Sequence, residues 1–222
     1  MAAGVAIVAG DTKVAGRGQV DGLFITTTGV GELLPGVRTG GALARPGDDI
    51  LVTGDIGRHG SAILLARGSY GIDSAITSDC APLAATVRAL FAAVPDKSAI
   101  HTIRDATRGG VGTVLHEIAA ESHVGIELYA PAIPVAPEVR GVCGLLGLEP
   151  LYLACEGRLV IFAPQAIAPK LVETLRALPD SRQAAIIGHV TPDFSGRVVL
   201  RTEIGTKTLL PEPSGELLPR IC

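Results

Sequence analysis

Strand-like and helix-like patterns alternate along most of this chain, from about Arg45 to Leu210. Short β-branched stretches favour strands, and apolar residues that recur every three or four positions favour helices. Because their alternation is typical of an α/β or α+β domain, we predict one such domain over residues 45–210. Its expected strands cover residues 49–53, 99–103, 124–129, 158–162, 184–188 and 196–200, the last being the final strand of the chain. Its expected helices pass through residues 62–66, 80–94, 114–119, 137–148 and 166–178.

Two further strands are expected in a separate N-terminal region, at residues 5–9 and 21–30. A run rich in glycine and proline follows and indicates a domain boundary, which separates residues 1–44 from residues 45–210. The apolar start of the chain is similar to the core of a signal peptide, but no Lys or Arg precedes it and Asp11 follows at once. We interpret this start as a buried strand.

Composition argues against several classes of function. The net charge of −3 comes from 19 basic and 22 acidic residues, so there is no excess positive charge for binding nucleic acid. Aromatic residues make up 3% of the chain and Trp is absent, which leaves few platforms on which bases could stack. No apolar run approaches the roughly 20 residues of a membrane helix, so we expect no membrane partner. The four cysteines form no C-x-x-C pair, which favours a reduced, cytoplasmic protein.

The first motif that could carry chemistry is Gly10-Asp-Thr-Lys13, directly after the first expected strand. Asp11 offers a hard oxygen ligand, Thr12 a hydroxyl and Lys13 a cation, and this combination suits Mg²⁺ and phosphate. The alternative interpretation is an ordinary turn at the end of a strand.

The second motif, Asp105-Ala-Thr-Arg-Gly-Gly110, lies between an expected strand and an expected helix. Free main-chain N–H groups and the positive end of the helix dipole would point at one spot there, which favours an anion. Arg108 would add a bidentate donor, and Asp105 could bind a metal ion. The motif is neither a P-loop nor the dinucleotide-binding fingerprint, and similar loops also occur with nothing bound.

Single residues add two candidates. Glu156 lies in an apolar, small-residue stretch, where a carboxylate is either a turn residue with satisfied hydrogen bonds or a general base. His59 stands in a glycine turn at residues 57–60 and could touch a ligand. His116 gives no functional signal of its own.

The chain ends in a cysteine on a proline-rich arm. Residues 209–222 carry three prolines and one glycine, which oppose a helix and favour extended backbone. From Pro211 to Cys222 the arm could span roughly 36 Å at about 3.3 Å per residue. Its thiol could enter a pocket on this molecule or on a partner, and the alternative is a frayed tail that happens to end in cysteine. The other three cysteines are expected to behave as small apolar residues: Cys80, Cys143 and Cys155.

Five motifs, taken together and in this order, resemble the HypE family of [NiFe]-hydrogenase maturation proteins in the PurM/AIRS-like ATP-binding superfamily. The resemblance runs from about residue 4 to the end of the chain, and the terminal Pro-Arg-Ile-Cys is its most specific part. The motifs are Gly10-Asp-Thr-Lys-Val14, Asp105-Ala-Thr-Arg-Gly-Gly110, Arg140-Gly-Val-Cys-Gly-Leu-Leu-Gly-Leu148, Cys155-Glu-Gly157 and Pro219-Arg-Ile-Cys222.

This resemblance implies a PurM/AIRS-like fold and the activity of a carbamoyl dehydratase. In the family the terminal thiol, here Cys222, receives a carbamoyl group from the partner HypF. ATP then activates the amide oxygen, and loss of phosphate leaves a thiocyanate, whose cyanide passes to iron on a HypC–HypD scaffold. Carried onto this chain, the family pattern gives Lys13 and Glu156 proton transfer and amide orientation. The residues expected around ATP are Asp11, Thr12, His59, Asp105, Thr107, Arg108, Gly109 and Gly110, of which Asp11 and Asp105 would hold Mg²⁺.

The chain departs from the family pattern at its N-terminus. Family members carry a Gly-rich segment and further acidic ligands upstream of the strand expected at residues 5–9, so residues 1–44 correspond to a remnant of the family's first domain. That domain also supplies the family's homodimer interface. A catalytically silent module that only docks partners or accepts the carbamoyl group therefore stays open as the alternative. Another superfamily member such as selenophosphate synthetase is disfavoured, because those proteins lack the terminal Pro-Arg-Ile-Cys.

Overall fold

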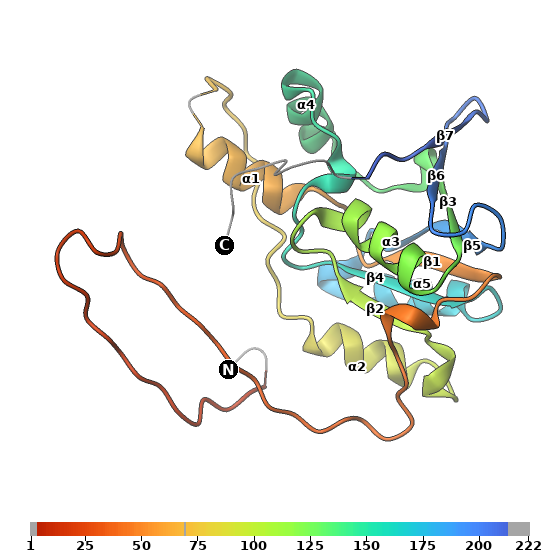
Figure 1. The fold of residues 1–222 in the computed structure, drawn as a ribbon, viewed down its shortest axis with the longest axis horizontal. Helices are drawn as coiled ribbons and strands as arrows, with labels where there is room; N and C mark the ends of the chain where they lie inside the picture. Colours follow the sequence, from red (N-terminus) through yellow and green to blue (C-terminus); the bar gives the residue numbers. More distant parts are fainter. Residues whose placement is uncertain (1–3, 69, 213–222) are drawn as a thin grey trace.

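The computed structural model describes residues 4–68 and 70–212, and a single mixed sheet carries its fold (Figure 1). The strands lie in the order β2-β4-β1-β5-β3-β6-β7 across the sheet. Their bounds are β1 Asp48–Val52, β2 Thr102–Asp105, β3 Gly125–Tyr129, β4 Leu159–Pro164, β5 Ala185–Thr191, β6 Val198–Arg201 and β7 Lys207–Leu209.

Strand β1 lies inside the sheet and pairs antiparallel with β4 on one side and with β5 on the other. In this register Ile50 lies opposite Phe162. Strands β3 and β6 pair in parallel, with Ile126 opposite Val198, whereas the other strand pairs of the described chain are antiparallel. The predicted mixed α/β fold is therefore confirmed.

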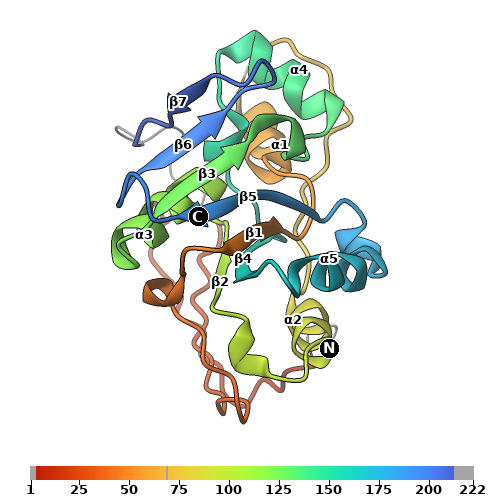
Figure 2. The same ribbon diagram turned by 90° about the vertical axis from the view of Figure 1, so that its right-hand side faces the viewer.

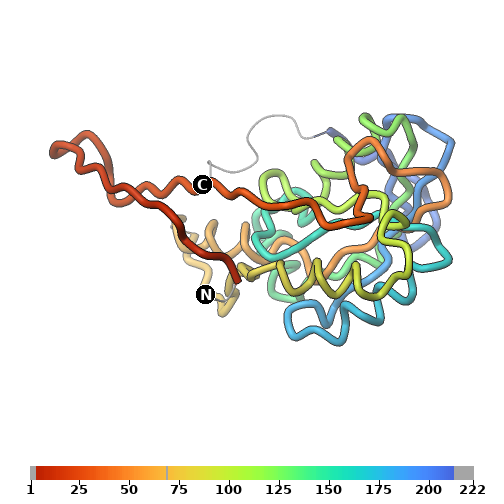
Figure 3. The backbone as a smooth tube through the Cα atoms, turned by 90° about the horizontal axis from the view of Figure 1, so that it is seen from below, coloured from red at the N-terminus to blue at the C-terminus, as the bar shows by residue number. Residues whose placement is uncertain are grey.

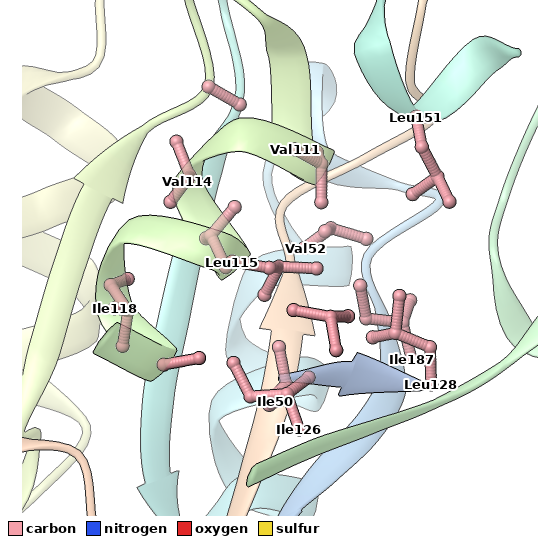
Figure 4. Close-up of a cluster of buried hydrophobic side chains, with 14 of the residues drawn as sticks. Ile50, Val52, Val111, Val114, Leu115, Ile118, Ile126, Leu128, Leu151 and Ile187 are labelled. Carbon is pink, nitrogen blue, oxygen red and sulfur yellow. The ribbon is translucent and has the colours of Figure 1, made fainter. Parts of the chain in front are cut away.

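Helices cover both faces of the sheet (Figure 2). The side chains of a strand alternate between faces, so Ile50 and Val52 pack under one layer and Leu51 under the other. The first layer contains α3, whose Val111, like Leu151 of the short 3-10 helix η4, lies over the sheet (Figure 4). The second layer contains α2 and α5, and α1 packs beside α4. The helices are α1 Arg58–Arg67, α2 Ala84–Ala92, α3 Gly110–Glu121, α4 Pro137–Leu146 and α5 Ala168–Arg176, with 3-10 turns η1 Gly41–Leu43, η2 Lys97–Ala99, η3 Ala130–Ala132, η4 Pro150–Tyr152 and η5 Pro179–Ser181.

Three expected boundaries are wrong within this domain. The helix expected from residue 80 begins at Ala84. In the preceding segment the Ser78 hydroxyl accepts from the Cys80 N–H, and the Asp79 carboxylate accepts from the Glu156 N–H, so this segment is held in another conformation. The strand expected at residues 99–103 is β2 at Thr102–Asp105, preceded by η2, which the Asp96 side chain caps. The strand expected to be the last is followed by β7, a short exposed strand that returns through a turn at residues 202–206.

The two strands expected at residues 5–9 and 21–30 are wrong. The N-terminal segment forms no strand and extends away from the domain as a long loop (Figures 1 and 3). Its apolar side chains have no layer to pack against, and Ile7 is 94% exposed. Since a strand is stable only when its main chain pairs with a neighbour, apolar β-prone residues alone do not form one here.

Every helix of the described residues falls short of the length and apolar character needed to cross a bilayer.

Candidate functional site

The loop from Asp105 to Gly110 joins the end of β2 to the start of α3. The hydroxyl of Thr107 donates a hydrogen bond of 2.7 Å to Oδ2 of Asp105, which holds this exposed carboxylate in place. Gly109 and Gly110 both have positive φ angles, +73° and +63°. No side chain of the described residues caps the N-terminus of α3, so its first turn keeps the character of an anion-binding helix end.

Gly110 is fixed by close packing as well as by its backbone. A Cβ atom at this position would lie 2.5 Å from the Leu153 carbonyl oxygen and 2.6 Å from that of Leu151. The loop therefore lies directly on the η4 segment, with main chain against main chain, and only glycine fits there.

Two hydrogen bonds through Ala106 place Glu156 beside this loop. The N–H of Cys155 donates to the Ala106 carbonyl at 3.0 Å, and the N–H of Ala106 donates to the Arg158 carbonyl at 3.1 Å. Glu156 lies between these two partners in the chain and is half-buried. Glu156 and the Asp105–Gly110 loop, which are about fifty residues apart in the sequence, thus form one local site.

A buried carboxylate also holds Glu156 in place. The N–H of Glu156 donates a hydrogen bond of 3.0 Å to Oδ1 of Asp79. A Cβ atom at Gly157 would lie 1.8 Å from the Asp79 carbonyl oxygen, so the Cys155-Glu-Gly157 motif needs its glycine for this close approach. Burial raises the pKa of Asp79, while the Glu156 N–H and the Arg158 guanidinium act in the opposite direction.

Arg158 ties these segments together from inside the protein. Its guanidinium is buried and donates to Oδ1 of Asp55 at 2.8 Å and to the main-chain carbonyl of the same residue at 2.9 Å. It also donates to the carbonyls of Gly157 and Asp180, both at 3.1 Å. The guanidinium of Arg158 therefore links three segments of the domain, those that contain Asp55, Gly157 and Asp180.

A pocket of about 360 Å³ opens beside this network. His59 lies at its edge, where Nδ1 is 2.8 Å from the Ser78 hydroxyl, and that hydroxyl accepts from the Cys80 N–H. The pocket is lined by Gly54, Asp55, Arg58, Thr77, Ser78, Asp79, Cys80, Ala81, Arg158, Pro179, Asp180, Arg182 and Gln183.

The structure does not bring Asp11, Thr12 and Lys13 to this site. They lie in the exposed N-terminal segment, where their side chains have no partner among residues 4–68 and 70–212 (Figure 3). No group of three His, Cys, Asp or Glu residues in the described chain is arranged to hold a metal ion, so Asp105 is a single carboxylate rather than part of a cage. Cys222 lies outside the described residues.

Asp55, Asp79 and Arg158 were not predicted from the sequence, because buried charges have no periodic signal. The prediction for the cysteines is wrong at Cys80, which is exposed next to the pocket, whereas Cys143 and Cys155 are buried.

Comparison with known proteins agrees with this architecture. Residues 45–201 match the family described as AIR synthase related protein, C-terminal domain. The chain therefore belongs to the AIR synthase related family.

Comparison with curated proteins confirms the resemblance to HypE. Carbamoyl dehydratase HypE of Azotobacter vinelandii is 49% identical over 99% of this chain. The chain spans 64% of the length of that relative.

Solved structures agree with this assignment. A crystal structure of hydrogenase maturation protein HypE in complex with ATP is similar at a TM-score of 0.75 and 39% identity, covering 83% of this chain and 55% of that one. A crystal structure of a HypE–HypF complex is similar at a TM-score of 0.77 and 36% sequence identity. The match covers 82% of this chain and 58% of that one.

Proposed function

We propose that this chain acts in the maturation of [NiFe] hydrogenases, as part of an ATP-dependent carbamoyl dehydratase that converts a carbamoylated Cys222 to a thiocyanate. The observation that carries the proposal is the pair of hydrogen bonds through Ala106, which places Glu156 beside the Asp105–Gly110 loop. A carboxylate beside an anion-binding helix end is the arrangement that such a reaction needs, because a proton must leave nitrogen while phosphate is held nearby.

The reaction balances as a dehydration driven by ATP. The amide oxygen of the S-carbamoyl group takes up the γ-phosphoryl group, and the C–O bond then breaks with phosphate as the leaving group. Both amide protons leave nitrogen, and the products are thiocyanate, ADP and phosphate. We assign to Glu156 the role of accepting a proton from nitrogen, and to Lys13, which lies in the exposed N-terminal segment of this structure, the role of the second proton-transfer residue.

The loop supplies the phosphate-binding half of the proposed site. Gly109 and Gly110 let the main chain approach a phosphate group closely, and Arg108 is exposed on the same loop as a further donor. Thr107 holds Asp105 in a position to meet a cation that accompanies the triphosphate. The loop therefore suits the phosphate groups of ATP, and bound Mg²⁺ would neutralise part of their charge. We propose Asp11, Thr12 and His59 as further nucleotide neighbours, although this structure does not bring Asp11 and Thr12 to the loop.

The similarity to solved proteins supports the choice of cofactor and partner. Because HypE has been solved with ATP and with HypF, we propose ATP as the nucleotide and a HypF-like protein as the carbamoyl donor. A HypC–HypD-like scaffold as cyanide acceptor, a homodimer, and action in the cytoplasm complete the proposal. We assign residues 1–44 to a first domain, residues 45–210 to the second and residues 211–222 to the tail that carries the acceptor thiol.

A second candidate function is a module that docks partners or accepts the carbamoyl group without dehydrating it. The observation that favours it is the exposed position of Lys13 in the N-terminal segment, which runs outside the domain that carries Glu156 (Figure 1). ATP titration by calorimetry, on this chain and on a version extended upstream to the length of its relatives, separates the two. The module predicts binding by neither chain, whereas the dehydratase predicts binding by the extended chain.

Intact-mass spectrometry with the carbamoyl donor and ATP tests the chemistry. The extended chain should gain the mass of one carbamoyl group at Cys222 and then lose the mass of one water. Cys222→Ala should gain nothing, whereas Glu156→Gln should gain the carbamoyl group and keep it. An undiminished adduct in Cys222→Ala, or an undiminished loss of water in Glu156→Gln, would overturn the assignment.

A further inference from the structure

The end of the described chain, Leu210–Glu212, is fixed to the body of the domain. Leu210 is buried in the core under α3, and its N–H donates a hydrogen bond of 2.8 Å to the Val198 carbonyl. The Pro211 carbonyl accepts a hydrogen bond from the hydroxyl of Tyr152. The Glu212 carboxylate lies 3.7 Å from the guanidinium of Arg197.

Tyr152 connects this point to the candidate site. It belongs to η4, the segment that leads to Glu156, and its ring packs on the first turn of α3. A Cβ atom at Gly112 would lie 2.5 Å from the ring carbon Cε1, so the contact is close enough to require glycine. Pro211 is therefore one side chain away from the helix that begins at Gly110.

His116 lies one turn further along α3 and faces the same residues. Neither ring nitrogen completes a hydrogen bond to a described residue, and burial is the main reason that the pKa of His116 is lowered. The Glu212 carboxylate and the Pro211 carbonyl raise this pKa, and the Arg197 guanidinium lowers it. The surroundings of His116 are thus partly made by residues 211 and 212.

The topology shows why a fixed point here matters. Strand β7 forms the sheet edge opposite β2, the strand that ends in Asp105. Six strand spacings of about 4.8 Å separate these two edges, or about 29 Å. The ten residues beyond Glu212 span at most about 33 Å at about 3.3 Å per residue, so a tail that left freely from β7 would use nearly all its length in crossing the sheet.

We propose that Tyr152 is a positioning residue for the C-terminal tail: together with His116 and Arg197 it forms an intramolecular docking site for Leu210–Glu212. Because of this docking, the last ten residues of the chain start from the face of the sheet that carries α3 and η4, and not from the β7 edge. The end of the described chain is then held, through Tyr152, beside the first turn of α3, the helix that follows the Asp105–Gly110 loop. That the docking positions the tail for catalysis rests on the proposed function. The docking itself is tested by measurements that need no activity.

Tyr152→Phe, which removes only the hydroxyl, tests the docking by amide hydrogen exchange. We expect the Leu210 N–H to exchange roughly three- to tenfold faster, the range that corresponds to one net hydrogen bond. Tyr129→Phe is the matched control, because the hydroxyl of Tyr129 meets Nδ1 of His189 at 2.7 Å on another part of the sheet. Unchanged exchange at Leu210 in Tyr152→Phe, or an equal change in both variants, would overturn the docking site.

NMR titration of His116 gives an independent test, because the two variants should shift the pKa of His116 in opposite directions. In Tyr152→Phe the ring gains solvent, so its pKa should rise towards the ordinary value. In Glu212→Gln the hydrogen bonds of Leu210 and Pro211 remain but the negative charge near His116 is lost, so the pKa should fall further. A His116 pKa unchanged in both variants would refute the placement of residues 211 and 212.

The role in catalysis is tested separately on the extended chain. Tyr152→Phe should slow the dehydration of carbamoylated Cys222 while leaving carbamoyl transfer by excess donor unchanged. If dehydration keeps its rate although Leu210 exchanges faster, the positioning role is wrong. If the extended chain without a substitution forms no carbamoyl adduct, the proposed function is wrong. The hydrogen-exchange and NMR results then still decide whether Leu210–Glu212 is docked.

Discussion

The main-chain N–H of Glu156 donates a hydrogen bond of 3.0 Å to Oδ1 of Asp79, a carboxylate whose side chain has no exposed surface. The other oxygen of Asp79 has no hydrogen-bond partner among the described residues and lies 3.7 Å from Nε of Arg158. The position of the candidate general base thus depends on a buried charge from a loop 77 residues earlier in the chain.

The first prediction concerns pH and Asp79. Burial raises the pKa of Asp79 above its ordinary value of 3.8, so the folded protein holds this proton to a higher pH than the unfolded chain does. The contribution of Asp79 to stability is therefore highest below the ordinary pKa and decreases as pH rises towards the raised one. Asp79→Asn keeps an acceptor for the Glu156 N–H but does not titrate.

Urea unfolding of both proteins at several pH values checks this. The stability of the natural protein relative to Asp79→Asn should fall as pH rises from about 4, where the ordinary carboxyl group titrates. A relative stability that rises over the same range would contradict the raised pKa.

The second prediction concerns Arg158. Arg158→Met removes the partner of a buried carboxylate and of three carbonyl groups, so we expect a loss of about 3–5 kcal/mol in the free energy of unfolding. The control is Arg104→Met, because Arg104 and Glu117 form an ion pair at 2.6 Å whose side chains are 39% and 44% exposed. Such a pair contributes about 0–1 kcal/mol. Equal losses in urea unfolding of the two variants would show that Arg158 is not the centre of a buried network.

The sequence predicted the parts of the fold that have a periodic signal. Helix α3 follows from Val114, Leu115 and Ile118, whose spacing places them on one buried face. Strand β4 follows from its continuous apolar run, since both of its faces are covered. The N-terminal strands failed because residues 5–9 and 21–30 have the composition of strands and no neighbour to pair with.

The candidate site could be predicted only in part. The Asp105–Gly110 loop and Glu156 were visible because polar and glycine residues interrupt apolar stretches. Their proximity was not visible, because it depends on pairing between β2 and β4 and on the main-chain bonds of Ala106. Tyr152 gave no signal either, since its role comes from Pro211, 59 residues later in the chain.

The third prediction concerns the loop that starts α3. Gly110→Ala should lose more stability than Gly147→Ala, although both glycines have positive φ angles, +63° and +68°. At Gly147 nothing lies within 4 Å of the added methyl group, so only the left-handed backbone costs energy, about 1–2 kcal/mol. At Gly110 the methyl group also meets two carbonyl oxygens of η4, which should add about 1–3 kcal/mol.

Thermal or urea unfolding of the two glycine variants measures the difference. Amide exchange in the Asp105–Gly110 loop should increase in Gly110→Ala and stay unchanged in Gly147→Ala. Equal destabilisation would mean that the loop moves away from η4 at no cost, against the close packing described above.

The fourth prediction concerns the exposed N-terminal segment. Val8, Phe24 and Val30 are 92%, 77% and 100% exposed, and several neighbours are similar. Because apolar surface on this scale marks an association site, this chain should self-associate as its concentration rises. Light scattering should show a mass that grows with concentration, and a double variant with Val8→Lys and Phe24→Lys should reduce it. Leu145→Lys, at an isolated exposed position on α4, is the control and should have no effect. A monomer at high concentration would contradict the prediction.

The last prediction concerns the reactivity of the thiols, on which the mass-spectrometric test depends. Burial raises the pKa of Cys155 to about 12, and its Sγ accepts a hydrogen bond of 3.2 Å from the Gly57 N–H inside the core. At pH 8 a thiol with this pKa is roughly one part in ten thousand thiolate, the form that reacts. Burial also raises the pKa of Cys143, whereas Cys80 is exposed beside the pocket.

Brief alkylation of the native protein with iodoacetamide should therefore modify Cys80 and spare Cys143 and Cys155, while all three should react in urea. Cys80→Ser should remove the native label at this position without changing the protection of the buried pair. Because Cys80 is the accessible thiol within the described residues, it is also the cysteine at which any non-specific carbamoyl adduct would form. An adduct on Cys80 that equals the one on Cys222 would mean that exposure alone, rather than delivery of the terminal thiol, determines which cysteine is modified. Labelling of Cys155 in the native protein before Cys80 would contradict the burial on which this prediction rests.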